Sequence, residues 1–210
     1  MKTNYDAAVI GAGVFGVWTA YALARQGRRV VLLDAHGAGN SRSSSGGETR
    51  IIRMNYGADE LYTRLSQKSL RQWLRFCAET HLPLFHRTGA LFTAPKGHPH
   101  LKAAAEVLSS CGVRHEVLGV RDLKSRFPQI QFDTVTALYE PHSGVLMARR
   151  AVMALLEECE RLGVRYLTDA ATWDKGLRTA SGRKIAAAQY VFACGPWLPR
   201  LFPEILDGRI

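Results

Sequence analysis

The order of the expected elements predicts an α/β fold, with a doubly wound parallel sheet that is interrupted by a mixed α+β insertion. Two short apolar runs, at 7–10 and 29–33, are typical of parallel strands buried on both faces. An Ala- and Leu-rich segment at 13–26 separates them and predicts a helix, which Gly27 ends as a C-terminal cap. Strand, helix and strand in this order form the βαβ unit from which such sheets are built.

Periodicity and turn residues predict the remaining elements. The stretch 36–48 is rich in serine and glycine and is expected to be a loop. Strands at 137–140 and 144–147 are expected to form a hairpin or strand pair. Further helices are expected at 59–80, 98–110, 122–126 and 149–162, and further strands at 84–93, 115–118, 164–167 and 190–193, with a polar hairpin at 174–184.

The composition, 47% hydrophobic and 22% charged, is that of a globular protein. The apolar runs are strand-sized, so we expect no membrane span. Met1–Asp6 is polar and leads directly into a strand, which predicts no signal peptide and a cytoplasmic protein. The cysteines are far apart and form no CxxC pair, so reduced core thiols are expected rather than a disulfide framework or a zinc site; they are Cys77, Cys111, Cys159 and Cys194.

The net charge of +10 raises the question of nucleic-acid binding. The basic residues are dispersed, however, and no interleaved aromatic residues form a stacking platform. A positive field also attracts anionic cofactors and carboxylate substrates. We therefore expect a small-molecule ligand and no nucleic-acid partner.

Gly11, Gly13 and Gly16 form a GxGxxG motif, which is weak evidence when it stands alone. Here the motif leaves a buried strand, opens a helix and precedes Asp34, at the end of the next strand, by 18 residues. Gly11 permits the turn, Gly13 the approach of a pyrophosphate, and Gly16 close helix packing, while Asp34 accepts hydrogen bonds from ribose. The alternative is a βαβ unit whose glycines serve packing only. The whole pattern favours a Rossmann-like dinucleotide-binding domain.

Three later segments carry a resemblance to a known family. They are T-R-I-I-R at 49–53, followed by N-Y-G at 55–57; E-P-H-S-G-V at 140–145; and C-G-P-W at 194–197. The chain resembles, in register over its whole length, the sarcosine oxidase-like branch of the D-amino-acid-oxidase superfamily. The resemblance implies FAD as the cofactor and an oxidoreductase acting on an amine or N-methyl amino acid. It further implies an FAD-binding domain at 1–82 and 142–210 and an incomplete substrate domain at 83–141.

The resemblance also implies roles for individual residues. Arg53 matches a position that engages the substrate carboxylate together with a later lysine, and Arg50 lies near the flavin; both are the expected catalytic residues. The alternative is a pair of solvated arginines at the start of a helix. No metal site is expected. The positions expected to bind FAD are Gly11, Gly13, Val14, Phe15, Gly16, Asp34, Ala35, Ser44, Ser45, Thr49, Arg50, Thr172, Cys194, Gly195 and Trp197.

Two departures from the family pattern affect the expected function. Gly46 stands where several relatives have a histidine near the flavin. Family members are also markedly longer, and their additional part supplies an oxygen-activating lysine and, in some, a cysteine bonded to the flavin. We therefore expect non-covalent FAD, a small carboxylate-bearing amine as substrate, and possible self-association or a C-terminal partner chain. A truncated FAD-binding module without activity is the alternative. An NAD-dependent dehydrogenase is disfavoured, because it gives T-R-I-I-R no role.

Overall fold

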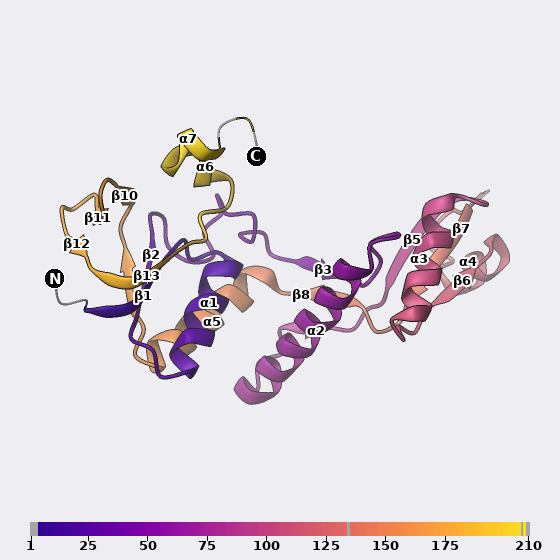
Figure 1. Ribbon diagram of the computed structural model, residues 1–210. Helices are drawn as coiled ribbons and strands as arrows, with labels where there is room; N and C mark the ends of the chain where they lie inside the picture. The colour runs from indigo at the N-terminus through magenta and orange to yellow at the C-terminus, as the bar shows by residue number, and fades with distance from the viewer. Residues whose placement is uncertain (1–3, 134, 207, 209–210) are drawn as a thin grey trace. The chain divides into compact units, whose positions relative to one another are not determined.

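The computed structural model describes residues 4–133, 135–206 and 208 (Figure 1). The chain forms two compact units: unit 1 comprises the residues up to Glu48 and those from Met147 onward, and unit 2 comprises Thr49–Leu146. These boundaries differ from those expected from the sequence, which assigned residues 49–82 and 142–146 to the same domain as the glycine motif. The reason is packing, because Leu70 shares a buried cluster with Leu138 of the insertion.

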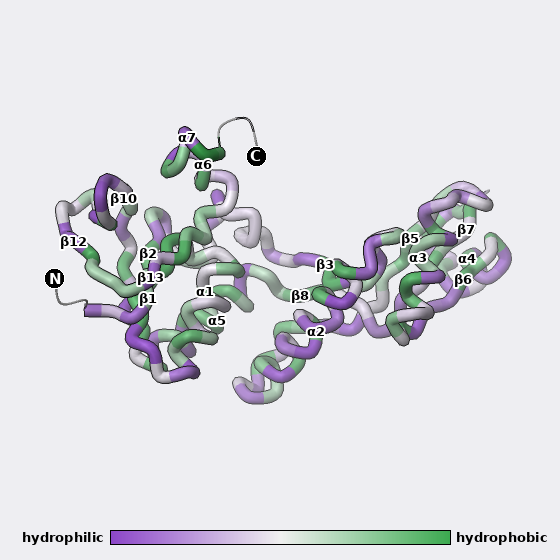
Figure 2. Tube along the Cα trace, in the orientation of Figure 1, coloured by the Kyte–Doolittle hydropathy of each residue, from purple (hydrophilic) through white to green (hydrophobic). Residues whose placement is uncertain are grey.

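A four-stranded parallel sheet forms the centre of unit 1, in the order β13-β1-β2-β9. Its strands are β1 (Tyr5–Ile10), β2 (Val30–Asp34), β9 (Arg165–Thr168) and β13 (Ala187–Phe192). The two central strands are almost entirely buried, and this part of the chain is strongly hydrophobic (Figure 2). The α/β class and the parallel sheet are therefore confirmed.

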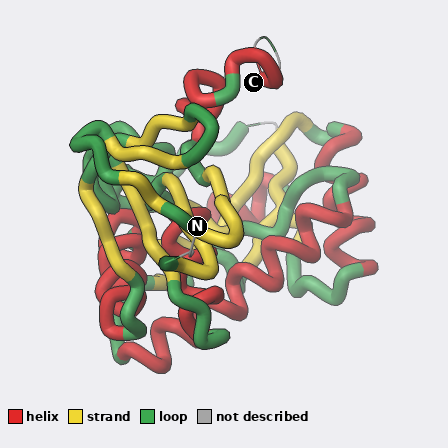
Figure 3. Tube along the Cα trace, turned by 60° about the vertical axis from the view of Figure 1, so that its left-hand side comes forward, coloured by secondary structure: helices red, strands yellow, loops and turns green. Residues whose placement is uncertain are grey.

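Two helices form one layer of this unit. Helix α1 (Val14–Arg25) packs against β1 and β2, and α5 (Ala148–Arg161) lies beside α1. Strands and helices form separate layers (Figure 3). The buried thiol of Cys159 on α5 donates to the carbonyl of Val17 at 3.5 Å, and burial raises its pKa to about 12. It serves as a small core residue, and all four cysteines are free.

A small antiparallel sheet covers the other face of the parallel sheet. Its strands are β10 (Ala171–Trp173), β11 (Leu177–Thr179) and β12 (Lys184–Ile185). Leu177 and Ile185 pack into the cluster formed by the side chains of β1 and β2 that point away from α1. The polar hairpin expected at 174–184 is thus present, and β10 adds a third strand to it.

The residues after β13 pack back on the parallel sheet. After β13, the short helices η1 (Gly195–Trp197), α6 (Leu198–Leu201) and α7 (Pro203–Leu206) follow. The Phe202 ring lies 4.7 Å from that of Phe192 on β13, measured between centroids. No helix in the described ranges is both long enough and apolar enough to cross a membrane.

The described residues of unit 2 form two small antiparallel sheets and three helices. The sheet orders are β3-β8-β4 and β5-β7-β6. The elements are β3 (Arg50–Ile52), α2 (Glu60–Thr80), β4 (Phe85–His86), β5 (Ala90–Pro95), α3 (Pro99–Ser110), β6 (Glu116–Leu118), α4 (Val120–Arg126), β7 (Val135–Glu140) and β8 (Gly144–Leu146).

The expectation that residues 137–140 and 144–147 pair with each other is wrong. Strand β7 pairs with β5 and β6, whereas β8 pairs with β3 and β4. The chain turns sharply between them, and Gly144 lies directly against β4, where a Cβ would approach the carbonyl oxygen of His86 to 2.1 Å. That close approach holds β8 in the sheet with β3 and β4.

A buried carboxylate connects two distant segments of unit 2. Glu140, only 1% exposed, accepts hydrogen bonds from the backbone N–H groups of Met54 at 2.7 Å and Asn55 at 2.8 Å. The hydroxyl of Ser143 also donates to it. The E-P-H-S-G-V segment therefore holds the chain immediately after T-R-I-I-R.

Replacing Glu140 with alanine should lower the free energy of unfolding by about 3 kcal/mol, because two buried N–H groups lose a charged acceptor. Urea denaturation measures this. Glu106→Ala, at an exposed site on α3, is the matched control and should change stability by less than about 0.5 kcal/mol. Equal stabilities of the two variants would contradict the assigned role.

Candidate functional site

The glycine turn between β1 and α1 is too tight for side chains at two positions. Gly11 has a φ of +102°, and a Cβ there would lie 2.4 Å from the carbonyl oxygen of Ala193. A Cβ on Gly16 would lie 1.7 Å from the carbonyl oxygen of Gly11. Both obstacles are backbone atoms and cannot move aside. The two glycines therefore allow α1 to start directly at the carboxyl end of β1.

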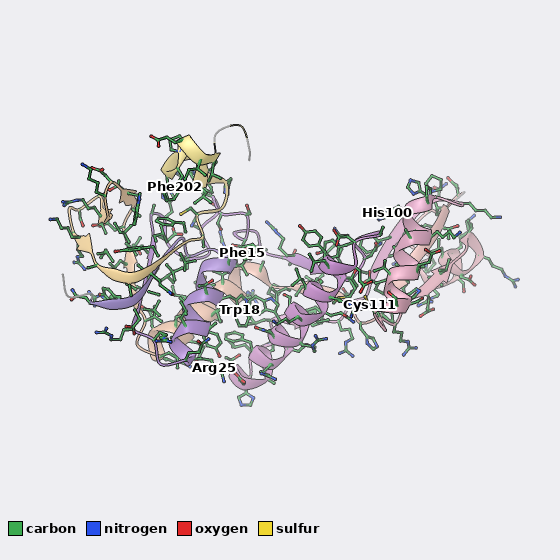
Figure 4. All side chains as sticks on the ribbon, viewed as in Figure 1. Phe15, Trp18, Arg25, His100, Cys111 and Phe202 are labelled. Atoms are coloured by element: carbon green, nitrogen blue, oxygen red, sulfur yellow. The ribbon has the colours of Figure 1, made fainter. Side chains whose placement is uncertain are left out.

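Gly13, by contrast, marks the open side of the turn. A Cβ there would meet only the hydroxyl oxygen of Ser45, at 3.4 Å. Gly13 is the N-cap of α1, and its own position supplies no side-chain cap. The N–H of Val14 donates to the Ser45 hydroxyl at 3.2 Å, and Phe15 in the same turn is 81% exposed (Figure 4). The amides and partial positive charge of such a helix start suit a phosphate.

Asp34 lies beside this turn, at the end of the neighbouring parallel strand. One carboxylate oxygen accepts from the N–H of Ala12 and the other from the N–H of His36, both at 2.8 Å. The acid thus joins the turn after β1 to the segment after β2, where the exposed Ala35 also lies. Each oxygen retains further acceptor capacity, as ribose hydroxyls require.

The segment 39–47, here called the serine loop, lies over the start of α1. Within it, the hydroxyl of Ser43 donates to the carbonyl of Asn40 at 3.0 Å, and Ser45 contacts Val14 as described. A Cβ on Gly46 would lie 1.9 Å from the Asn40 carbonyl oxygen, so this loop conformation requires glycine. A histidine side chain would not fit here. Ser44 is exposed on the same loop.

Residues after β13 reach the same edge of the sheet. The thiol of Cys194 donates to the carbonyl of Ile10, at 3.4 Å. Burial and then the Asp34 charge raise the pKa of this thiol to about 11, which keeps it protonated at neutral pH. Gly195 follows with a φ of +55°, and Trp197 is half-buried. The fold thus gathers the glycine turn, Asp34, Ser45 and Cys194 at the carboxyl ends of adjacent strands.

Thr172, which was expected to bind FAD, lies in β10 of the small antiparallel sheet. Its hydroxyl donates to the Arg178 carbonyl within that sheet.

Asp169 lies beside Asp34 and was not among the residues expected from the sequence. It follows β9 directly, and its N–H donates to the Asp34 carbonyl at 2.9 Å. Hydrogen bonds from Ser181 and then Thr179 lower the pKa of Asp169. The sequence feature that could have indicated Asp169 is an acidic residue immediately after a parallel strand.

The T-R-I-I-R segment belongs to unit 2. Arg50 lies in β3, exposed, and its guanidinium donates to the Thr49 carbonyl at 2.7 Å. Helix α2 begins only at Glu60, so neither arginine of this segment lies at a helix start. The helix-start placement in the alternative is therefore wrong, whereas Arg50 is exposed as that alternative expected.

Arg53 is held in place from several directions. Its guanidinium donates to the Asn55 carbonyl at 2.6 Å and lies 4.8 Å from the Tyr56 ring centroid and 5.2 Å from that of Phe92. The side-chain amide nitrogen of Asn55 is buried without a hydrogen-bond partner in the described residues. A guanidinium restrained in this way can bind a carboxylate through two parallel hydrogen bonds.

Comparison with known proteins identifies the family of the chain. The family described as "DAO: FAD dependent oxidoreductase" matches residues 6–210. The monomeric sarcosine oxidase of Bacillus sp. (strain B-0618) is 31% identical over 98% of the chain, and the human peroxisomal sarcosine oxidase is 34% identical over 95% of it. These matches cover 55% and 53% of the relatives' own lengths.

The solved structure of NikD, described as an unusual amino acid oxidase essential for nikkomycin biosynthesis, has a TM-score of 0.80 at 25% identity. It covers 97% of this chain, which covers 54% of NikD. The chain therefore spans about half the length of the relatives that it matches. The family match over nearly the whole chain shows that it belongs to the DAO family of FAD-dependent oxidoreductases.

Proposed function

We propose that unit 1 binds FAD non-covalently at the edge where β1, β2 and β13 end, and that the protein oxidises the C–N bond of a small amine or N-methyl amino acid. The observation that carries the proposal is the glycine turn beside Asp34, in a chain of an FAD-dependent family. When bound, FAD supplies a ring that accepts a hydride and that oxygen reoxidises. Amino-acid side chains cannot accept a hydride in this way.

The residues of unit 1 fit the phosphates and ribose of FAD. The pyrophosphate would approach Gly13 from its open side, where the Ser45 hydroxyl, which accepts from the Val14 N–H, can donate its own proton to a phosphate oxygen. Asp34 would accept from the ribose while keeping its two backbone contacts. The remaining proposed cofactor-binding residues of unit 1 are Gly11, Phe15, Gly16, Ala35, Ser44, Thr172, Cys194, Gly195 and Trp197; Thr49 and Arg50, also proposed, belong to unit 2.

We assign substrate binding to unit 2. Arg53 would bind the substrate carboxylate, because its guanidinium is already restrained by Asn55, Tyr56 and Phe92. Arg50 would add positive charge that favours the uptake of negative charge by a hydride-accepting ring. Sarcosine, the substrate in the names of two relatives, is an N-methyl amino acid with a carboxylate and thus belongs to the proposed class.

A second candidate function is an FAD-binding module that has no activity by itself and requires a C-terminal partner chain or self-association. The geometry of the FAD site supports this candidate as well, because Gly13, Asp34 and Ser45 all lie within unit 1. Both candidates share the FAD site, and catalysis distinguishes them.

The first expected outcome is that the purified protein carries FAD, or takes it up when FAD is supplied, and releases all of it on acid precipitation. No thiol attachment is proposed, so the yellow colour should stay in the supernatant. The visible spectrum of both fractions measures this. Flavin retained in the pellet, or a colourless protein that binds only NAD, would contradict the proposal.

Substitutions at two glycines should separate cofactor binding from folding. Gly13→Ala should weaken FAD binding at least about tenfold, equivalent to 1.4 kcal/mol, because the methyl group meets the pyrophosphate. Its Tm should change little, because the methyl group fits at 3.4 Å from Ser45. Gly16→Ala should instead lower the Tm strongly, since its Cβ would meet backbone at 1.7 Å. Fluorescence titration with FAD and thermal denaturation measure the two effects, and unchanged affinity in Gly13→Ala would exclude this phosphate position.

Catalysis by the 210-residue chain should be weak or absent even with FAD bound. A catalytic site must position substrate and cofactor precisely together, and Arg50 and Arg53 provide at most one wall of it. A peroxide-coupled assay over sarcosine, N-methyl amino acids, proline, pipecolate and D-amino acids measures turnover. Robust turnover that is lost in Arg53→Ala, but kept in the exposed control Arg71→Ala, would overturn this expectation and show that the chain carries a complete site.

A further inference from the structure

We propose that Arg149 is a positioning residue of the cofactor site: it closes the serine loop at both ends and thereby sets the affinity for FAD. The inference rests on the proposed FAD-binding function. All of the contacts that carry it lie within unit 1.

Arg149 lies in the first turn of α5 and contacts both ends of the serine loop. Its backbone N–H donates to the carbonyl of Gly47 at 3.2 Å, and its side-chain Nε donates to the carbonyl of Gly39 at 3.1 Å. The first N–H groups of a helix have no partner within the helix, so Gly47 satisfies one of them. The guanidinium also lies 3.3 Å from a carboxylate oxygen of Glu48.

Packing at Gly39 reinforces this closure. Gly39 is buried with a φ of +67°, and a Cβ there would lie 3.4 Å from Cγ of Arg149 and 3.2 Å from Cγ of Met153. The absence of a side chain lets the loop backbone lie directly on the aliphatic part of Arg149. The arginine therefore contributes both apolar packing and a hydrogen bond at the same point.

The interior of the loop transmits this closure to the start of α1. The carbonyl of Asn40 accepts from the N–H of Ser43 at 3.2 Å, and the carbonyl of Ser43 accepts from the N–H of Gly46 at 2.9 Å. These turns leave Ser45 with its hydroxyl on the Val14 amide. A loop ordered before binding loses less conformational entropy when the ligand arrives, which raises affinity. Closing the two ends of the loop therefore favours FAD binding.

The ion pair with Glu48 contributes little to this effect. The Glu48 side chain is 65% exposed, and exposed ion pairs are weak. The specific contribution of Arg149 is the hydrogen bond to Gly39. This distinguishes it from Arg150, the next residue in the same helical turn, which is exposed and carries the same charge.

The test compares Arg149→Met with the matched control Arg150→Met. Methionine keeps most of the apolar stem but removes the donors, and each substitution removes one positive charge and one trypsin site. Fluorescence titration should show FAD binding about tenfold weaker in Arg149→Met and unchanged in Arg150→Met. Trypsin cleavage after Arg42, an exposed residue of the serine loop, should be faster only in Arg149→Met, and saturating FAD should slow it. Arg149→Lys, which restores the charge and one donor, should recover part of the affinity.

Each outcome is decisive. Equal affinities of Arg149→Met and wild type, equal losses in both methionine variants, or no recovery in Arg149→Lys would overturn the role of Arg149. A wild-type chain that does not bind FAD would instead contradict the proposed function. In that case, the rate of cleavage after Arg42 still tests whether Arg149 orders the loop.

Discussion

The close packing of the glycine turn against β13 is the constraint on which the rest of unit 1 depends. A Cβ on Gly11 would lie 2.4 Å from the carbonyl oxygen of Ala193, and a Cβ on Gly16 would lie only 1.7 Å from that of Gly11. The start of α1 is therefore fixed at the carboxyl edge of the sheet. The Ala12 contact with Asp34 and the Val14 contact with Ser45 both follow from that position. A wider turn would displace all of these groups together.

Two carboxylates organise the chain around the motifs. Asp34 in unit 1 and Glu140 in unit 2 each accept two backbone N–H groups. A carboxylate has two oxygens with several lone pairs and can therefore join two chain segments while still accepting further bonds. Substitution of Asp34 would consequently disturb the turn as well as the ribose contact. Gly13, whose open side bears no such structural contact, is the cleaner probe of cofactor binding.

The two units contain different parts of the proposed chemistry. Unit 1 carries the glycine turn, Asp34 and the serine loop, which suit an anionic dinucleotide. Unit 2 carries Arg53, which suits a carboxylate, and Arg50, whose proposed role is to add positive charge for the flavin. Each unit contains an arginine that a backbone carbonyl orients: Asn55 accepts from Arg53, and Gly39 accepts from Arg149.

The sequence by itself determined the first strand, helix and strand and the roles of Gly11 and Gly16, because glycine spacing and apolar periodicity are local patterns. The family followed from the resemblance carried by the segments at 49–53, 140–145 and 194–197. It also placed Asp34 at the end of the second strand. Only the tertiary structure placed Ala187 beside Tyr5, separated β7 from β8, made residues 50–52 a strand, and brought Glu140 to Met54 and Arg149 to Gly39. Asp169 beside Asp34 belongs to the same group. These contacts join residues far apart in the chain, and their partners are selected by packing and hydrogen-bond geometry that no local pattern records.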